Sequence, residues 1–145
     1  MSEPTTKQSD VSDEEPIYFC FRASLRIFGD DLDIDEITRT LGIEPTHSHR
    51  KGERSSHMAQ PWPHDMWCFE PPIDETRPLH EHIMALWNAV RPNILYLRAL
   101  KQQFHVDVFC GYRSNSDTAG FEVDYHCLGL FAELEIPLGI SVIIA

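Results

Sequence analysis

Basic residues are scarce in this chain of 145 residues, which holds 12 lysines and arginines against 23 aspartates and glutamates. The formal net charge is −11 and the sequence pI is about 5.0. A surface of this sign repels nucleic acid phosphates and anionic lipid headgroups. The composition therefore argues against nucleic acid and membrane surfaces as partners and favours a protein partner with a basic surface.

Long apolar runs are also absent, because no segment offers the roughly 18 uninterrupted apolar residues that a membrane span requires. Residues 1–16 lack the basic start and apolar run of a signal peptide and are mostly acidic and polar. We therefore expect a cytoplasmic protein. Its residues 1–16 should form a disordered acidic tail, and residues 17–145 a single domain.

The cysteines lack the CxxC spacing of redox and zinc motifs. Two of them lie within apolar, strand-like runs, as free cysteines acting as small hydrophobes do. A disulfide framework is therefore not expected from Cys20, Cys68, Cys110 and Cys127.

Motifs that carry catalysis are missing too. The chain has no GxSxG, no HExxH and no phosphate-binding glycine loop. Asp31, Asp33 and Asp35 are spaced like the opening of a calcium loop, but Glu36 and Gly42 occupy the positions that need glycine and glutamate. The sequence thus indicates no catalytic residue and no cofactor, and a non-enzymatic role is the stronger interpretation.

The clearest local pattern runs from residue 17 to residue 53. Apolar residues alternate over 17–27, which predicts a strand covered on one face. Asp33 with Glu36 resembles a capping box that begins a helix, and Gly42 followed by Pro45 ends it. Further strands are predicted at 46–51, 66–70, 106–112, 121–125 and 138–144. Helices are predicted at 79–90, 94–103 and 128–134. Thr76 or Arg77 would cap the helix at 79–90, and Arg91-Pro92 would break the helical stretch after it.

This order of elements predicts the α+β class. We expect a mixed, mainly antiparallel sheet with helices on one face. The first six elements follow a ferredoxin-like order, which a further β-α-β unit extends.

A basic turn is the first candidate binding site. Arg50, Lys51 and Arg54 surround Gly52, in a setting suited to receive a carboxylate or phosphate, and Trp62 would cover such a ligand. The alternative is a solvated turn whose cations pair with Asp30, Asp31 or the acidic tail. The acids Asp30, Asp31 and Asp33 are in turn candidates for contacting a basic protein, unless they only stabilise the helix start.

Histidines are a second candidate, since the chain has 8 of them. His47 and His49 would project from the same face of a strand and, with His57, His64 or Cys68, would complete a zinc site. Their spacing matches no recognised zinc motif, so an exposed polar strand is the stronger interpretation. His82 lies on an apolar helix stripe and is predicted to be a hydrogen-bonded core residue.

Several segments together resemble the bacterial family catalogued as domain of unknown function 4279, over residues 18 to 144. They are Ser24 to Gly29, Ile37 to Gly42, Pro45, Arg50-Lys51-Gly52, Trp67, Leu79 to Ile83 and Phe109 to Tyr112. The resemblance implies a fold but no activity and no catalytic residue. By analogy with other small acidic bacterial domains, a toxin immunity protein is one hypothesis.

Two classes of function follow from these patterns. The first is a protein-interaction module whose acidic surface binds a basic partner. The second is a small-ligand or phosphate-binding domain that uses the basic turn, with weak enzyme activity as an extension. An edge strand on either side of the sheet would also support a homodimer through backbone pairing.

Overall fold

The computed structural model describes residues 16–145, so the predicted acidic tail lies outside the described residues except for Pro16. The elements, in chain order, are β1 (Phe19–Gly29), α2 (Ile34–Leu41), β2 (His47–His49), β3 (Asp65–Phe69), α3 (Leu79–Val90), η1 (Arg91–Asn93), α4 (Ile94–Lys101), β4 (His105–Ser114), η2 (Tyr125–Leu128), α5 (Gly129–Leu134) and β5 (Gly139–Ile144). No helix among these residues is long and apolar enough to span a bilayer.

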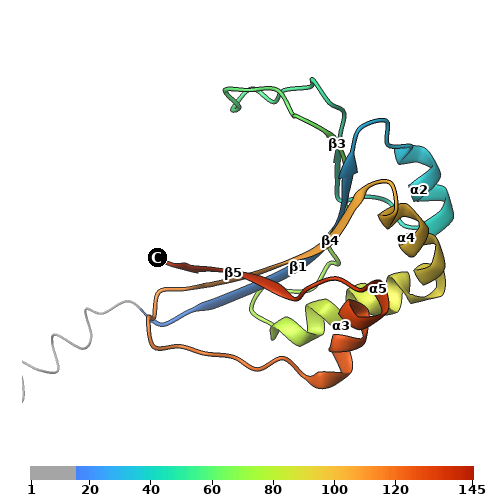
Figure 1. The fold of residues 1–145 in the computed structure, drawn as a ribbon. Helices are drawn as coiled ribbons and strands as arrows, with labels where there is room; N and C mark the ends of the chain where they lie inside the picture. The colour runs from blue at the N-terminus through green and yellow to red at the C-terminus, as the bar shows by residue number, and fades with distance from the viewer. Residues whose placement is uncertain (1–15) are drawn as a thin grey trace, which may run out of the picture.

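One five-stranded sheet organises the fold, with the strand order β2-β3-β1-β4-β5. β1 pairs antiparallel with β3 and β4, and β2 pairs antiparallel with β3, whereas β5 is parallel to β4. The predicted α+β class and mixed, mainly antiparallel sheet are therefore confirmed. Helices α2, α3, α4 and α5 lie on one side of the sheet, and within residues 16–145 no helix covers the opposite side (Figure 1).

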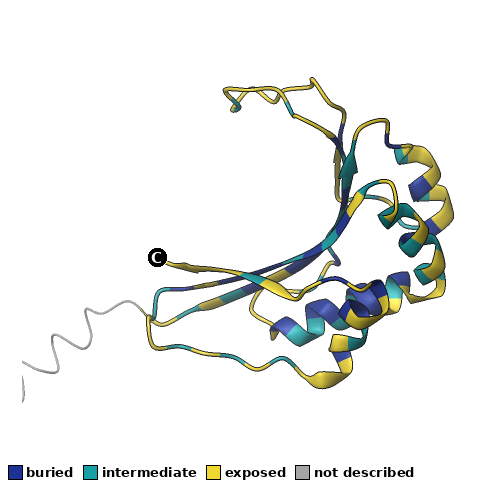
Figure 2. Cartoon of the chain, viewed as in Figure 1, coloured by how far each residue is buried: buried dark blue, intermediate teal, exposed yellow. Residues whose placement is uncertain are grey.

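The alternation of β1 explains this one-sided cover. Phe21, Leu25 and Ile27 are buried on the helix side, whereas the side chains of Arg22 and Arg26 point to the other face. Buried residues accordingly line the facing surfaces of the sheet and the helices (Figure 2). We call the surface that carries the even-numbered side chains of β1 the open face.

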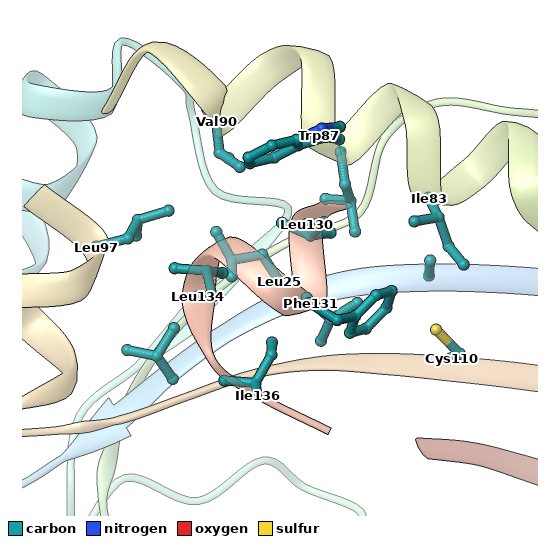
Figure 3. Packing of buried hydrophobic residues seen from close by; sticks show 14 of the residues in the cluster. Leu25, Ile83, Trp87, Val90, Leu97, Cys110, Leu130, Phe131, Leu134 and Ile136 are labelled. Carbon is teal, nitrogen blue, oxygen red and sulfur yellow. The ribbon is translucent and has the colours of Figure 1, made fainter. Parts of the chain in front are cut away.

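The core lies between β1 and β4 on one side and α3, α4 and α5 on the other (Figure 3). Leu25 from the sheet, Trp87 from α3 and Leu130 from α5 are all part of this single cluster. His82 is also buried, and its Nε2 lies 3.1 Å from the carbonyl oxygen of Arg77, as predicted for a core histidine.

Local signals set the ends of the helices well. Asp33 caps α2 by accepting the backbone N–H of Glu36, and Gly42 ends it with a φ of 67°, a conformation that costs an L-residue energy. The predicted break at Arg91-Pro92 is confirmed by η1 between α3 and α4. The predicted cap of α3 at Thr76 or Arg77 is wrong, because Pro78 occupies that position without a side-chain cap bond.

The strand predicted at 121–125 is also wrong. Residues 115–124 follow β4 without helix or strand structure. The ring of Phe121 packs edge-on against Phe21 and lies 4.9 Å from the ring of Tyr112, centroid to centroid. The alternating apolar residues of this segment therefore anchor a loop over the core instead of extending the sheet.

Candidate functional site

The predicted basic turn is built around interactions within the chain. Arg50 donates from Nη1 to the carbonyl oxygen of Leu32 at 2.6 Å, and Arg54 donates to the carbonyl oxygen of Ala59 at 3.4 Å. Lys51 Nζ lies 3.7 Å from Asp30 Oδ1. The three cations thus have separate internal partners, but only Lys51 pairs with one of the acids that the alternative of a solvated turn named. A ligand at this turn stays a prediction.

Asp65, which the sequence did not single out, organises this turn. Its carboxylate is buried at the start of β3 and accepts the backbone N–H groups of Lys51 at 2.7 Å and Leu32 at 3.0 Å. Arg50 Nη1 lies 3.6 Å from the same carboxylate. The Lys51 amide, the Leu32 amide and the Arg50 charge together lower the pKa of Asp65 below its ordinary value, although burial opposes them.

The acidic cluster divides into structural and exposed members. Asp33 caps α2, and Asp30 pairs with Lys51 and with His64, whose Nδ1 lies 3.2 Å away. Asp31 is exposed and has a φ of 60°, which aspartate tolerates better than most residues. Two of the three predicted partner-binding acids therefore serve local structure, and contact of any of them with a basic protein stays a prediction.

The two histidines of β2 do lie side by side, as predicted. His47 Nε2 is 2.7 Å from His49 Nδ1, and the indole of Trp62 stacks on His49 with centroids 3.8 Å apart and planes 9° apart. Burial, and then the proximity of His47, lower the pKa of His49. Within residues 16–145 no group of three or more His, Cys, Asp or Glu side chains is placed to hold a metal ion.

A separate cavity lies on the open face, and we call it the open-face groove. Its volume is about 610 Å³, within the range of ligand sites. It is lined by Tyr18, Cys20, Phe21, Arg22, Glu70, Ile73, Glu75, Phe109, Gly111, Tyr112, Arg113, Ser141 and Ile143. Strands β1, β4 and β5 and the segment after β3 therefore all contribute to it.

Strand register places the groove residues in rows across the sheet. Cys20 of β1 lies opposite Arg113 of β4, which lies beside Ile143 of β5. On the other side of β1, the carbonyl oxygen of Glu75 accepts the N–H of Phe21 at 2.7 Å. This row therefore contains, in order across the sheet, the acid Glu75, the thiol of Cys20, the cation Arg113 and the apolar Ile143 at the edge.

Gly111 sets the floor of the groove in the interior of β4. A Cβ at this position would lie 3.0 Å from Arg22 Cγ and 3.3 Å from Phe109 Cε1. Because glycine leaves this space, the stem of Arg22 and the ring of Phe109 can lie close to the backbone of β4. A glycine inside a strand often marks a close approach of a ligand or another backbone.

Charges of both signs face the groove. Arg22 Nη2 pairs with Glu70 Oε1 at 2.6 Å, so these two charges offset each other. No ion pair within residues 16–145 uses Arg113 or Glu75. The groove therefore offers a ligand the carboxylate of Glu75 on one side of Cys20 and the guanidinium of Arg113 on the other.

The thiols are unsuited to act as nucleophiles. Burial raises the pKa of Cys20, Cys68 and Cys127, and that of Cys110 to about 12. All four cysteines are free, and their raised pKa values keep the thiols protonated near pH 7. The thiol of Cys20 in the groove is therefore not activated.

Comparisons with known proteins give one result. The family model described as "Domain of unknown function (DUF4279)" matches residues 18–144. No curated protein and no solved structure matches the chain.

Proposed function

Because the chain belongs to the family described as domain of unknown function 4279, whose description names no activity, we propose its function from the geometry of the groove. It is a non-enzymatic protein-interaction module that holds an extended, basic segment of a partner protein in the open-face groove. The observation that carries this proposal is a cavity of about 610 Å³ on the sheet face opposite the helices, with Gly111 in its lining.

The charge distribution supports a basic segment over an acidic one. Glu75 is the groove carboxylate with no ion-pair partner within residues 16–145, so a lysine or arginine of the partner can pair with it. Arg113 is then available for a carboxylate or backbone carbonyl of the same segment. The net charge of −11 steers cationic surfaces toward the chain at long range.

The groove suits an extended segment because residues of strands β1, β4 and β5 form most of its lining. Apolar side chains at both borders, Ile73 and Ile143, provide contacts for the partner's apolar side chains. The basic turn at Arg50 lies outside this lining, and its cations are already bound to carbonyls and carboxylates. The groove is therefore favoured over the turn as the binding site.

A peptide display library selected against the purified chain tests the proposal. Gly111→Val serves as the matched variant, because it pushes Arg22 and Phe109 up into the groove while valine favours a strand. Peptides enriched in lysine and arginine should bind the parent chain and lose at least about tenfold in affinity for the variant, which corresponds to ~1.4 kcal/mol. The variant's thermal midpoint shows that it is folded.

Two results would contradict the proposal. Selected peptides without a basic preference would remove the role of Glu75. Equal affinity for the parent and for folded Gly111→Val would place the binding site away from the groove. In that case stabilisation by a metabolite, lost in Lys51→Glu, would support a small ligand at the basic turn instead.

We also propose the two finer descriptions that the sequence suggested. The strand order β2-β3-β1-β4, with antiparallel pairs throughout, supports a ferredoxin-like arrangement of the first six elements. An immunity role would be one case of binding a basic partner. Affinity purification from the host at low and moderate salt, with mass spectrometry of the bound proteins, checks whether that partner is a toxin.

A further inference from the structure

The two edges of the sheet differ in how they are protected. β2, at one edge, has only three residues, His47–His49, and follows Pro45. β5, at the other, has six residues without a charge or a proline. Natural proteins usually blunt an exposed edge with short strands, charges, prolines or bulges. β2 follows this rule and β5 does not.

Apolar side chains of β5 are exposed on both faces of the sheet. Val142 is 57%, Ile143 51% and Ile144 49% exposed. Val142 and Ile144 lie on the helix side, because they pair with Tyr112 and Ser114, whereas Ile143 lies on the open face. Neighbouring exposed apolar residues of this kind mark an interaction surface.

Charge indicates what covers this edge. Residues 136–145 contain no charged side chain, in a chain whose net charge is −11. Two copies of the chain repel each other over most of their surfaces, but they can meet along this segment without placing like charges together. A basic partner, by contrast, would find no carboxylate there to pair with.

We propose that β5 pairs antiparallel with β5 of a second copy, around a two-fold axis, and joins the two sheets into one. Residues opposite each other in an antiparallel pair point to the same face. Val142 is then placed against Val142 of the second copy, with Ile140 against Ile144 on either side. The apolar side chains of both copies become buried, and the unpaired backbone groups of β5 are satisfied.

This pairing also joins the two open-face grooves. Ser141 and Ile143 line the groove from β5, so in this register each lies opposite the other residue of the second copy. The two grooves then meet at the two-fold axis and form one channel across the joined sheet. The dimer itself does not depend on the proposed peptide function, because it forms without ligand.

Molar mass in solution tests the dimer. The parent chain should give twice 16.7 kDa by light scattering, with a shift toward the monomer on dilution. Val142→Lys places a charge against its own copy and should give a folded monomer, whose thermal midpoint matches that of the parent chain diluted until it is monomeric. Ile143→Lys, on the other face, is the second variant. Leu95→Lys, at an equally apolar residue of α4 that is 71% exposed, is the matched control and should stay dimeric.

Cysteine cross-linking locates the interface. Opposed residues of antiparallel strands bring their Cβ atoms to about 5 Å, within reach of a disulfide. Val142→Cys should therefore give a reducible dimer on mild oxidation, whereas Leu95→Cys should not. A mass of 16.7 kDa at every concentration, or a dimer unaffected by both lysine substitutions in β5, would overturn the proposal. Peptide binding by a monomer would leave the proposed function intact.

Discussion

At the scale of single residues, Asp65 connects parts of the chain that the sequence keeps apart. Its carboxylate accepts N–H groups from Leu32, 33 positions earlier, and from Lys51, 14 positions earlier. The connection fixes the turn after β1, the turn after β2 and the start of β3 relative to one another. A buried carboxylate in this role is costly to replace, because both amides then lose an ionised acceptor.

We therefore expect Asp65→Asn to lower the free energy of unfolding by about 1.5–3 kcal/mol, the range for hydrogen bonds to a charged group. Because folding lowers the pKa of Asp65, its contribution is present above the ordinary value of 3.8 and is lost as the pH falls through the folded-state pKa. Urea unfolding at pH 7 and at pH 3 measures both effects.

Asp31→Asn is the control for this prediction. Asp31 is exposed with a positive φ that asparagine also adopts, so its unfolding free energy should change by less than about 0.5 kcal/mol. A loss at Asp65 no larger than that at Asp31 would contradict the structural role assigned to this carboxylate.

The sequence predicted which residues lie next to each other better than it predicted what each residue does. The pairing of His47 with His49 follows from the two-residue period of a strand, and the capping role of Asp33 from its spacing to Glu36. The partners of Arg50 and the burial of Asp65 could not be predicted, because they depend on segments brought together only by the folded sheet. The role of Gly111 likewise could not be predicted, because it depends on Arg22, which lies opposite it only in the folded sheet.

At the scale of elements, the helices and paired strands were predicted within a few residues, because caps, glycines and apolar periodicity are local signals. The failure at 121–125 shows the limit of periodicity. Alternating apolar residues bury one side of any extended chain, whether or not a neighbouring strand is available to pair with it. Pairing depends on the rest of the sheet, and here β5 occupies the place beside β4.

The loop over residues 50–64 is held by a small set of contacts that respond to pH. The N–H of Gly52 donates to the carbonyl oxygen of Trp62, and the Trp62 ring stacks on His49. Burial and His47 lower the pKa of His49, while Glu53 and Asp65 act in the opposite direction. Because the pKa of His49 is lowered overall, protonation of His49 destabilises its contact with Trp62. Protonation therefore favours the state in which the loop over residues 50–64 is detached from β2.

We expect the docked loop to lose stability as the pH falls below about 6.5, the ordinary value for histidine, until the lowered pKa of His49 is passed. Hydrogen exchange at the amides of Gly52 and Trp62, corrected for intrinsic rates, should then accelerate relative to the rest of the sheet. His49→Phe keeps a ring under Trp62 without a titrating group and should remove the pH dependence. His57→Phe, at an exposed histidine of the same loop, should not.

At the scale of the whole molecule, charge and site play separate parts in binding. The net charge of −11 acts over the Debye length and affects how often a cationic partner arrives. The groove acts at contact and affects how long the partner stays. The two effects can be separated by substituting one acid inside the groove and one outside it.

Glu75→Lys and Glu44→Lys make this comparison, because each changes the net charge by two, from −11 to −9. With a selected basic peptide, both should slow association to a similar extent. Only Glu75→Lys should speed dissociation, by roughly tenfold, since it removes a contact of ~1–2 kcal/mol. Surface plasmon resonance at two salt concentrations measures both rates. Equal dissociation rates for the two variants would exclude Glu75 from the contact.

The central place of β1 in the sheet has a consequence for how the protein is made. β1 is the first strand of the sheet in the sequence, yet both of its neighbours come later, and Phe19 pairs with Ser114, 95 positions on (114 minus 19). At ~5–20 residues per second, roughly 5–20 s pass on the ribosome before that pair can form. During this time residues 19–24 of β1, which pair with β4 and not with β3, lack their partner strand. The arginines at positions 22 and 26 keep one face of β1 charged, which opposes association with other nascent chains.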